Sequence, residues 1–167
     1  GPISPQASKW VKDDIRTKDE LSIILDEFFI ELCKKVNKES AVRWMDVVNE
    51  TVLRNGEWFK EKPGNNKWEN PWTQIGINED EFPKYIVRSF EIAKEYAPNI
   101  KLVYNHNGGM EKLMWEKIME TITYLKSKGL RVDAIGWQAH LRTNSLSNED
   151  LNYLDYLIDW AHSNNLE

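Results

Sequence analysis

Polar side chains that could form hydrogen bonds or transfer protons end three otherwise apolar segments of the sequence. The segment "VRWMDVVNE" ends in Asn49-Glu50, "KLVYNH" ends in Asn105-His106, and "GWQAH" ends in Gln138-Ala139-His140. Amides donate and accept hydrogen bonds together, as sugar hydroxyl groups require, and a carboxylic acid beside them can serve as a general acid. The pattern therefore predicts one polar site for a neutral, hydroxyl-rich ligand, with Glu50 as its acid.

Each of these positions also has an ordinary structural explanation. A single Asn or Gln at the end of a strand is more often a turn residue, and a single His is more often a hydrogen-bonded structural group. The agreement among three segments favours the shared site over that explanation. A metal ion would require more His or carboxylate ligands than the pattern offers, so we expect neither a metal nor a cofactor.

Glu50 has no evident carboxylate partner in the sequence. Glycoside hydrolysis normally requires two carboxylic groups, ~5–5.5 Å apart for retention of configuration or ~6.5–9.5 Å apart for inversion. Asp46 lies four residues before Glu50, which along a strand is about 13 Å, and Asp133 falls at the opposite, amino end of its segment. The sequence thus supplies one half of such a pair.

The elements that must position these side chains alternate between strands and helices. Apolar residues at helical spacing, with capping boxes at Thr17-Lys18-Asp19-Glu20 and Ser147-Asn148-Glu149-Asp150, predict helices over about 17–36, 81–96 and 110–128 and a final helix from 147. Apolar, β-branched runs predict strands over 41–49, 100–105 and 132–141, and a long polar and aromatic loop follows over 51–80. This order predicts a parallel sheet whose carboxyl ends share one face.

Composition excludes several classes of partner. The 167 residues carry a formal net charge of -5 with no cluster of Lys or Arg, which argues against nucleic acid and anionic membranes. No apolar run approaches the roughly 20 residues that span a bilayer, and no signal peptide is visible. Eight Trp are more than expected; they hint at a sugar site but also fill cores.

Three ordered motifs resemble family 10 of the glycoside hydrolases, the (β/α)8 xylanase family. "WMDVVNE", "KLVYNHN" and "DAIGWQAHL" are similar to its fourth, fifth and sixth strands, and the resemblance extends through "SPQASKW", "WTQIG" and "YIVRSFEIA". It implies an α/β fold, a partial (β/α)8 TIM barrel with about the fourth to sixth strand-helix units plus the preceding helix. Residues 1–167 would then be a partial catalytic domain, incomplete at both ends.

The resemblance also implies a role for each polar residue at the strand ends. Glu50 would be the general acid/base, and Asn49 would bind the 2-hydroxyl group of the sugar at the cleavage point. Gln138 and His140 would lie beside the nucleophile and the same sugar, and Asn105 would border the cleft. The nucleophile, a Glu on the family's seventh strand, would lie outside this chain.

The implied activity is that of a retaining endo-β-1,4-glycanase of the xylanase type, which hydrolyses β-1,4-xylosidic bonds in xylan. Because polymeric xylan does not enter cells, we expect the parent protein to be secreted or periplasmic. Two alternatives remain open, a non-catalytic carbohydrate-binding α/β module and a half-barrel that associates with itself. On the fragment interpretation, the isolated chain is expected to be inactive and to associate with missing barrel segments or with itself.

The sequence departs from the family pattern in three places. Met45 separates Trp44 from Asp46, which moves the indole ring to the other face of the strand. His106 replaces the usual Asp, either as part of a changed subsite for the leaving group or as a tolerated loop substitution. The loop over 51–80 is longer than the family norm, and its Trp58, Phe59 and Trp68 either form a sugar platform or pack as the loop's own small core. Trp72 matches a family position and is predicted to bind substrate.

Overall fold

The computed structural model describes residues 2–5, 11, 16–59, 70–143 and 145–167. In chain order its elements are α2 (Lys18–Val36), β1 (Trp44–Asn49), the 3-10 helix η1 (Pro71–Ile75), α3 (Lys84–Tyr96), β2 (Lys101–His106), α4 (Lys112–Ser127), β3 (Ala134–Trp137) and α5 (Asn148–Ser163). All four predicted helices and all three predicted strands are present. No helix in the described ranges combines the length and the apolar character that crossing a membrane requires.

Local sequence explains where the helices begin and which face they bury. Thr17 and Ser147 cap α2 and α5 through the two predicted capping boxes, in which the third helical residue, Glu20 or Asp150, returns a hydrogen bond to the cap. The buried stripe of α2 repeats every four residues, at Leu21, Leu25, Phe29 and Cys33. Burial raises the pKa of the Cys33 thiol to about 12, so this cysteine is a small apolar residue of the core, as predicted.

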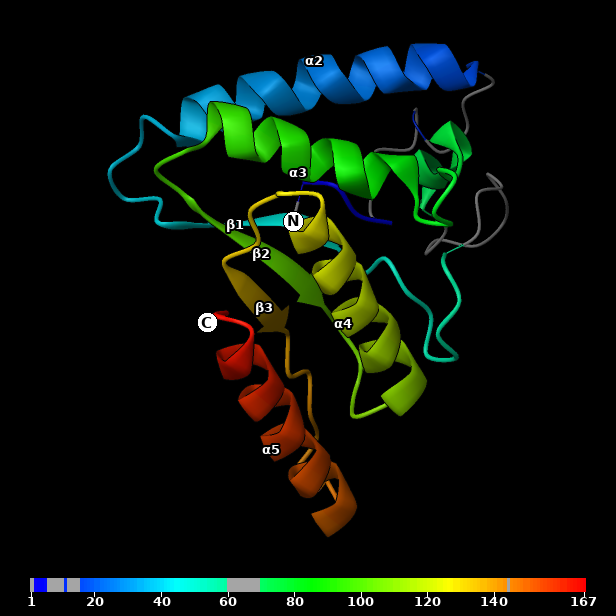
Figure 1. The fold of residues 1–167 in the computed structure, drawn as a ribbon, viewed down its shortest axis with the longest axis vertical. Helices are drawn as coiled ribbons and strands as arrows, with labels where there is room; N and C mark the ends of the chain where they lie inside the picture. The colour runs from blue at the N-terminus through cyan, green and yellow to red at the C-terminus, as the bar shows by residue number, and fades with distance from the viewer. Residues whose placement is uncertain (1, 6–10, 12–15, 60–69, 144) are drawn as a thin grey trace.

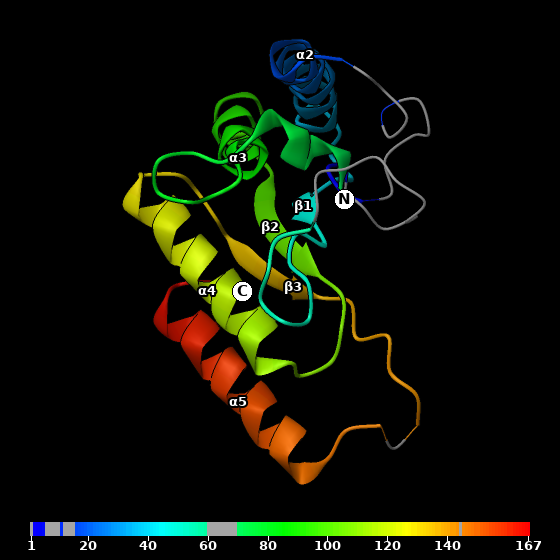
Figure 2. The ribbon, with the colours of Figure 1, turned by 90° about the vertical axis from the view of Figure 1, so that its right-hand side faces the viewer.

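The three strands form one parallel sheet in the order β1-β2-β3, which confirms the predicted architecture. Figures 1 and 2 show the helices gathered on one face of this sheet, with α2 running alongside α3. On the helix-covered face Tyr104 is fully buried and stacks on Phe90 of α3. Asn105 and Gly136 share the opposite face, where a side chain at the glycine would meet the amide.

A bulge in β1 changes which side chains share a face. Asp46 pairs with Val103 of β2 and Val48 pairs with the next residue, Tyr104, so Val47 is an extra residue in the strand. Asp46 and Asn49 would point to opposite faces of a regular strand, because side chains alternate. The bulge brings both to the same face, and it buries Val47 and Val48 completely.

The predicted strand boundaries need adjustment. β1 begins at Trp44, where 41 was expected, and β3 ends at Trp137, where 141 was expected. The chain leaves β3 because Ala139 adopts a left-handed conformation with φ of 49°, which a strand cannot contain. Trp44 is half exposed and faces the Lys101 ammonium group, while Met45 is buried, so the two residues do lie on opposite faces of β1.

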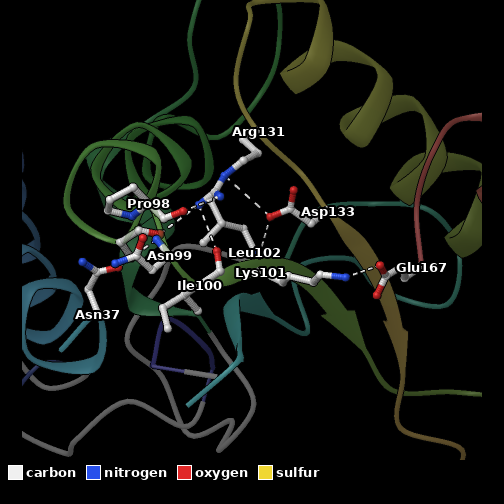
Figure 3. A network of polar contacts seen from close by, with 10 residues as sticks. Asn37, Pro98, Asn99, Ile100, Lys101, Leu102, Arg131, Asp133 and Glu167 are labelled. Carbon is white, nitrogen blue, oxygen red and sulfur yellow. Dashed lines mark hydrogen bonds and ion pairs between the residues drawn. The ribbon is translucent and has the colours of Figure 1, made fainter. Parts of the chain in front are cut away.

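The amino end of the sheet is closed by a polar network that serves the fold (Figure 3). The Arg131 guanidinium donates hydrogen bonds to the carbonyl groups of Ala97, Pro98 and Ile100. The Asp133 carboxylate accepts from the Leu102 backbone at 2.7 Å. Asp133 therefore lies at the amino end of the sheet, as predicted. Its carboxylate is used there in the hydrogen bond from Leu102.

Residues near both termini extend the sheet beyond its outer strands. Asn49 donates its backbone N–H to the Ile3 carbonyl, and Ile3 forms a parallel bridge with Val48 on the outer edge of β1. On the outer edge of β3, Glu167 donates to the Asp133 carbonyl and accepts from the Ile135 N–H. The same pattern of backbone pairing thus continues on each side of the sheet.

Candidate active site

The carboxyl ends of the three strands bring five of the six predicted site residues into one hydrogen-bonded network. Its members are Asn49 and Glu50 after β1, Asn105 in β2, and Gln138 and His140 after β3. This follows from the parallel sheet, because its carboxyl ends lie at one edge and polar residues there can meet.

Asn49 is the centre of this network. Its amide oxygen accepts hydrogen bonds from Asn105 at 2.9 Å and from Gln138 at 2.8 Å, while its own amide group donates to Glu50 at 3.2 Å. Asn105 uses its other hydrogen to reach the Asp46 carboxylate at 3.1 Å. The shared partner is possible because the bulge at Val47 turns Asp46 and Asn49 to one face. Asp46 therefore orients an amide and is not the second carboxylate at Glu50.

The two oxygen atoms of Glu50 have different surroundings. Oε1 accepts from the amides of Asn49 and Gln138, at 3.2 Å and 2.9 Å. Oε2 is buried and has no hydrogen-bond partner among the described residues. The residue is 4% exposed, and a buried polar atom without a partner costs on the order of 1–3 kcal/mol. A ligand that donates a hydrogen bond to Oε2 would remove this cost, while the two amides hold Oε1 in place.

The backbone at Glu50 is also unusual. Its φ of 55° is left-handed, a conformation that a residue with a side chain adopts only when its surroundings hold it. Its N–H donates to the Asn105 carbonyl, which continues the β1-β2 pairing past the end of the strand. The left-handed turn was not predicted, because nothing in "VVNETV" marks it: such turns are most common at Gly and Asn.

Gln138 and His140 approach from the segment that leaves β3. The amide oxygen of Gln138 accepts from His140 Nε2 at 2.9 Å, which leaves its amide nitrogen for Asn49 and Glu50. His140 is exposed and borders an open cleft of about 520 Å³. The cleft is lined by charged, small and apolar residues, among them Arg54, Gly108, Glu111 and Leu141. This cleft therefore adjoins the network at His140.

Gly136 is a site residue that the sequence analysis missed. It pairs with Asn105 across β2 and β3, and a Cβ atom at this position would lie 2.6 Å from the Asn105 amide oxygen. Only a glycine leaves room for that amide to reach Asn49 and Asp46. The signal was present in "AIGWQ", since a glycine inside a strand often marks close approach of another group.

Trp72 is not part of the network. It lies in η1, which packs against α2 and α3, and its side chain is 4% exposed. Its indole nitrogen has no hydrogen-bond partner among the described residues. Trp72 as a substrate-binding residue remains a prediction, and Trp68 lies outside the described residues.

Two other tryptophans hold the loop that follows β2. The indole N–H of Trp115 donates to the Gly109 carbonyl at 2.8 Å, and that of Trp137 donates to the Gly108 carbonyl at 2.9 Å.

Within the described ranges, no group of three or more His, Cys, Asp or Glu side chains is arranged to hold a metal ion.

Comparison with known proteins shows which family this chain matches. The family model described as glycosyl hydrolase family 10 matches residues 4–163. An endo-1,4-beta-xylanase A of Caldicellulosiruptor saccharolyticus is 35% identical over 139 residues, which cover 81% of this chain and 36% of the relative. An endo-1,4-beta-xylanase A of Xylanibacter ruminicola is 27% identical over 147 residues, which cover 87% of this chain and 36% of the relative.

Two solved structures resemble the fold of this chain. The crystal structure of native xylanase 10B from Thermotoga maritima superposes with a TM-score of 0.73 at 26% identity, over 97% of this chain and 44% of that chain. A mutant protein solved in complex with xylotriose gives a TM-score of 0.73 at 26% identity, over 95% of this chain and 44% of that one. The chain thus spans about a third of the length of the two curated relatives and under half of the two solved chains.

Proposed function

The chain belongs to glycosyl hydrolase family 10, and from that premise we propose that it forms the acid/base part of a retaining endo-β-1,4-xylanase. The 167 residues would be the central portion of the catalytic barrel, with the fourth to sixth strands and the helix that precedes them. The substrate would be xylan or its oligosaccharides, consistent with the xylanases that the chain resembles. We propose that the parent protein acts outside the cell, where polymeric xylan is found.

The observation that carries this proposal is the asymmetry of the Glu50 carboxyl group. Two amides hold Oε1, whereas Oε2 is buried and without a partner among the described residues. A general acid must present one oxygen, with its proton, to the glycosidic oxygen while the rest of the group stays fixed. In Glu50 the two amides fix Oε1, and Oε2 is left without a partner among the described residues, so the group meets both requirements.

The proposed reaction has two steps, and Glu50 acts in each. It first protonates the glycosidic oxygen as a carboxylate nucleophile attacks the sugar, and it then removes a proton from the water that hydrolyses the glycosyl-enzyme. Asn49 binds the 2-hydroxyl group of the sugar at the cleavage point, and Gln138 and His140 contact the same sugar. We propose that the nucleophile comes from a part of the protein outside these 167 residues.

The stereochemistry of the product tests this function directly. The complete protein is incubated with xylohexaose in D₂O, and the anomeric protons of the new reducing ends are followed by NMR. We expect the β-anomer to appear first and to mutarotate later, because two displacements restore the configuration. The Glu50→Gln variant serves as the control for contaminating enzymes. A product that appears first as the α-anomer would contradict the proposed mechanism.

Substitution of Gly136 should slow the reaction, although Gly136 is not among the residues proposed to contact the substrate. In Gly136→Ala the new methyl group displaces the Asn105 amide, and Asn49 loses one of the two amides that orient it. We expect kcat on xylan to fall about 10²-fold, the order of loss that follows from a small misplacement of catalytic groups. Overpacking should also lower the free energy of unfolding by about 1–3 kcal/mol.

A double-mutant cycle with Asn105→Ala separates this mechanism from general damage. If Gly136→Ala acts through Asn105, adding it to Asn105→Ala should cause little further loss of kcat. Losses that multiply in the double variant would show that Gly136 acts by another route.

A further inference from the structure

His106 occupies the strand end beside Asn105, but its side chain points to the other face of the sheet. It is 1% exposed and lies edge-on to the Trp115 ring of α4, with 6.3 Å between the ring centroids. A buried imidazole requires partners for both of its nitrogen atoms. The resemblance to family 10 does not explain it, because the family usually has Asp here.

Both ring nitrogens of His106 are hydrogen-bonded, and the partners define its protonation state. The backbone N–H of Val52 donates to Nε2 at 3.2 Å, so Nε2 carries no proton. Nδ1 lies 2.9 Å from the Asn107 carbonyl oxygen and is therefore the protonated nitrogen. The structure thus requires a neutral imidazole in a single tautomer.

The partner at Nε2 belongs to the segment that carries Glu50. Three successive residues of this segment are tied to β2: Glu50 through its N–H to the Asn105 carbonyl, Thr51 through its hydroxyl to the Tyr104 hydroxyl, and Val52 through its N–H to His106. The segment needs these ties because Glu50 is left-handed, which for a residue with a side chain costs on the order of 1–2 kcal/mol. Of the three, only the tie at Val52 depends on a group that titrates near neutral pH.

We propose that His106 is a positioning residue for Glu50: its neutral imidazole accepts the Val52 N–H and so holds the left-handed turn that directs the Glu50 carboxyl group into the site. This inference rests on the proposed function, in which Glu50 is the acid/base. It assigns a role to the position where the chain departs from its family.

Protonation of His106 would remove this support. Nε2 would then carry a hydrogen that faces the Val52 N–H, and the two donors would repel. Burial lowers the pKa of His106; the hydrogen bond to the Asn107 carbonyl and the negative charges of Glu50 and Glu111 oppose that effect. Arg54 pairs with Glu111 at 3.3 Å and weakens its influence. The neutral form therefore dominates at neutral pH, and the tie at Val52 is lost on the acid side.

The sign of the effect on stability follows from linkage. The pKa of His106 is lower in the folded protein than in the unfolded chain, where it is about 6.5. Between these two values the unfolded chain binds more protons, so stability falls as the pH decreases from about 6.5 toward the folded pKa. Above about 6.5 the imidazole is neutral in both states and makes no pH-dependent contribution.

Two substitutions of His106 separate positioning from simple space filling. In His106→Gln, an amide oxygen can take the place of Nε2 and accept from Val52, and it does not titrate; in His106→Leu, the space is filled without an acceptor. In the complete protein we expect the Leu variant to lose about 10²-fold in kcat on xylohexaose with little change in KM. The Gln variant should keep most of kcat and lose one ionisation from the acid limb of its pH profile.

Hydrogen exchange at the Val52 amide gives a readout that does not depend on activity. At pH 7 its protection should fall in the Leu variant and persist in the Gln variant. Ile118→Val, at a fully buried position of α4, is the control for lost stability and should leave both kcat and Val52 exchange unchanged.

The possible failures are distinguishable. Equal kcat in the Leu variant and the unchanged protein, or equal losses in the Leu and Gln variants, would overturn the positioning role. Unchanged exchange at Val52 in the Leu variant would overturn it as well. A complete protein that hydrolyses no xylohexaose would overturn the proposed function, and Val52 exchange would still decide whether His106 holds the turn.

Discussion

Replacing Glu50 by Ala in the complete protein is expected to affect substrates according to their leaving groups. Hydrolysis of xylan should fall ~10²–10⁴-fold or more, because a sugar alcohol leaves poorly without a proton donor. The first step on a nitrophenyl xylobioside should survive far better, because nitrophenolate needs little protonation. Deglycosylation should then become slow for lack of a base, so the covalent intermediate should accumulate and give a burst of nitrophenol.

Azide provides the decisive control for this experiment. It is a small anion that can occupy the space of the lost carboxylate, and it attacks the intermediate without a base. We expect added azide to restore turnover of the nitrophenyl substrate and to give a β-configured glycosyl azide, which NMR identifies. Equal losses on both kinds of substrate, with no response to azide, would make Glu50 a binding or structural residue. The central claim about this site would then fail.

The 167-residue chain by itself is expected to release no reducing sugar from xylan. Its described residues offer Glu50 but no second carboxylate that faces it, because Asp46 accepts from Asn105 and Asp133 lies at the amino end of the sheet. Without a nucleophile, we expect no measurable hydrolysis of xylan. A reducing-sugar assay on the purified chain makes the measurement. The same chain with Glu50→Gln is its matched control, since it removes the acid and keeps the shape.

The outcome that contradicts this expectation is equally specific. Turnover that Glu50→Gln abolishes would show that a partner carboxylate exists within these residues. A cooperative monomer by light scattering and thermal unfolding would favour the self-contained binding module over the barrel fragment. We expect association instead, because Ile3 and Glu167 pair with only part of the outer edges of β1 and β3, and the remainder of such edges invites further pairing.

Much of the fold could be predicted because the local signals agree with one another. The capping boxes at Thr17 and Ser147, the four-residue spacing of buried side chains in α2 and the apolar strands all indicate one architecture. The polar strand ends could be grouped into one site because parallel strands align their carboxyl ends. Asn49, Glu50, Asn105, Gln138 and His140 do lie together in the structure.

The remaining features depend on contacts between strands, which no single segment encodes. The room that Gly136 leaves for Asn105 is a property of the β2-β3 register. The tautomer of His106 is set by a backbone N–H that is distant in sequence, at Val52. The excess of tryptophan was ambiguous because an indole ring can bind a sugar, fill a core or hold a loop; Trp115 and Trp137 hold a loop.

The bulge at Val47 has a consequence for protein engineering and for evolution by insertion and deletion. Because Val47 is one residue more than the pairing with β2 requires, the five residues "DVVNE" place Asp46 and Asn49 on one face only while the bulge is kept. If the strand became regular with all five residues retained, alternation would turn either Asp46 or Asn49 toward the helices. Deletion of Val47 would instead leave Asp46 and Asn49 two residues apart and therefore still on one face. A graft must therefore carry the five residues together with the bulge, or four residues on a regular strand.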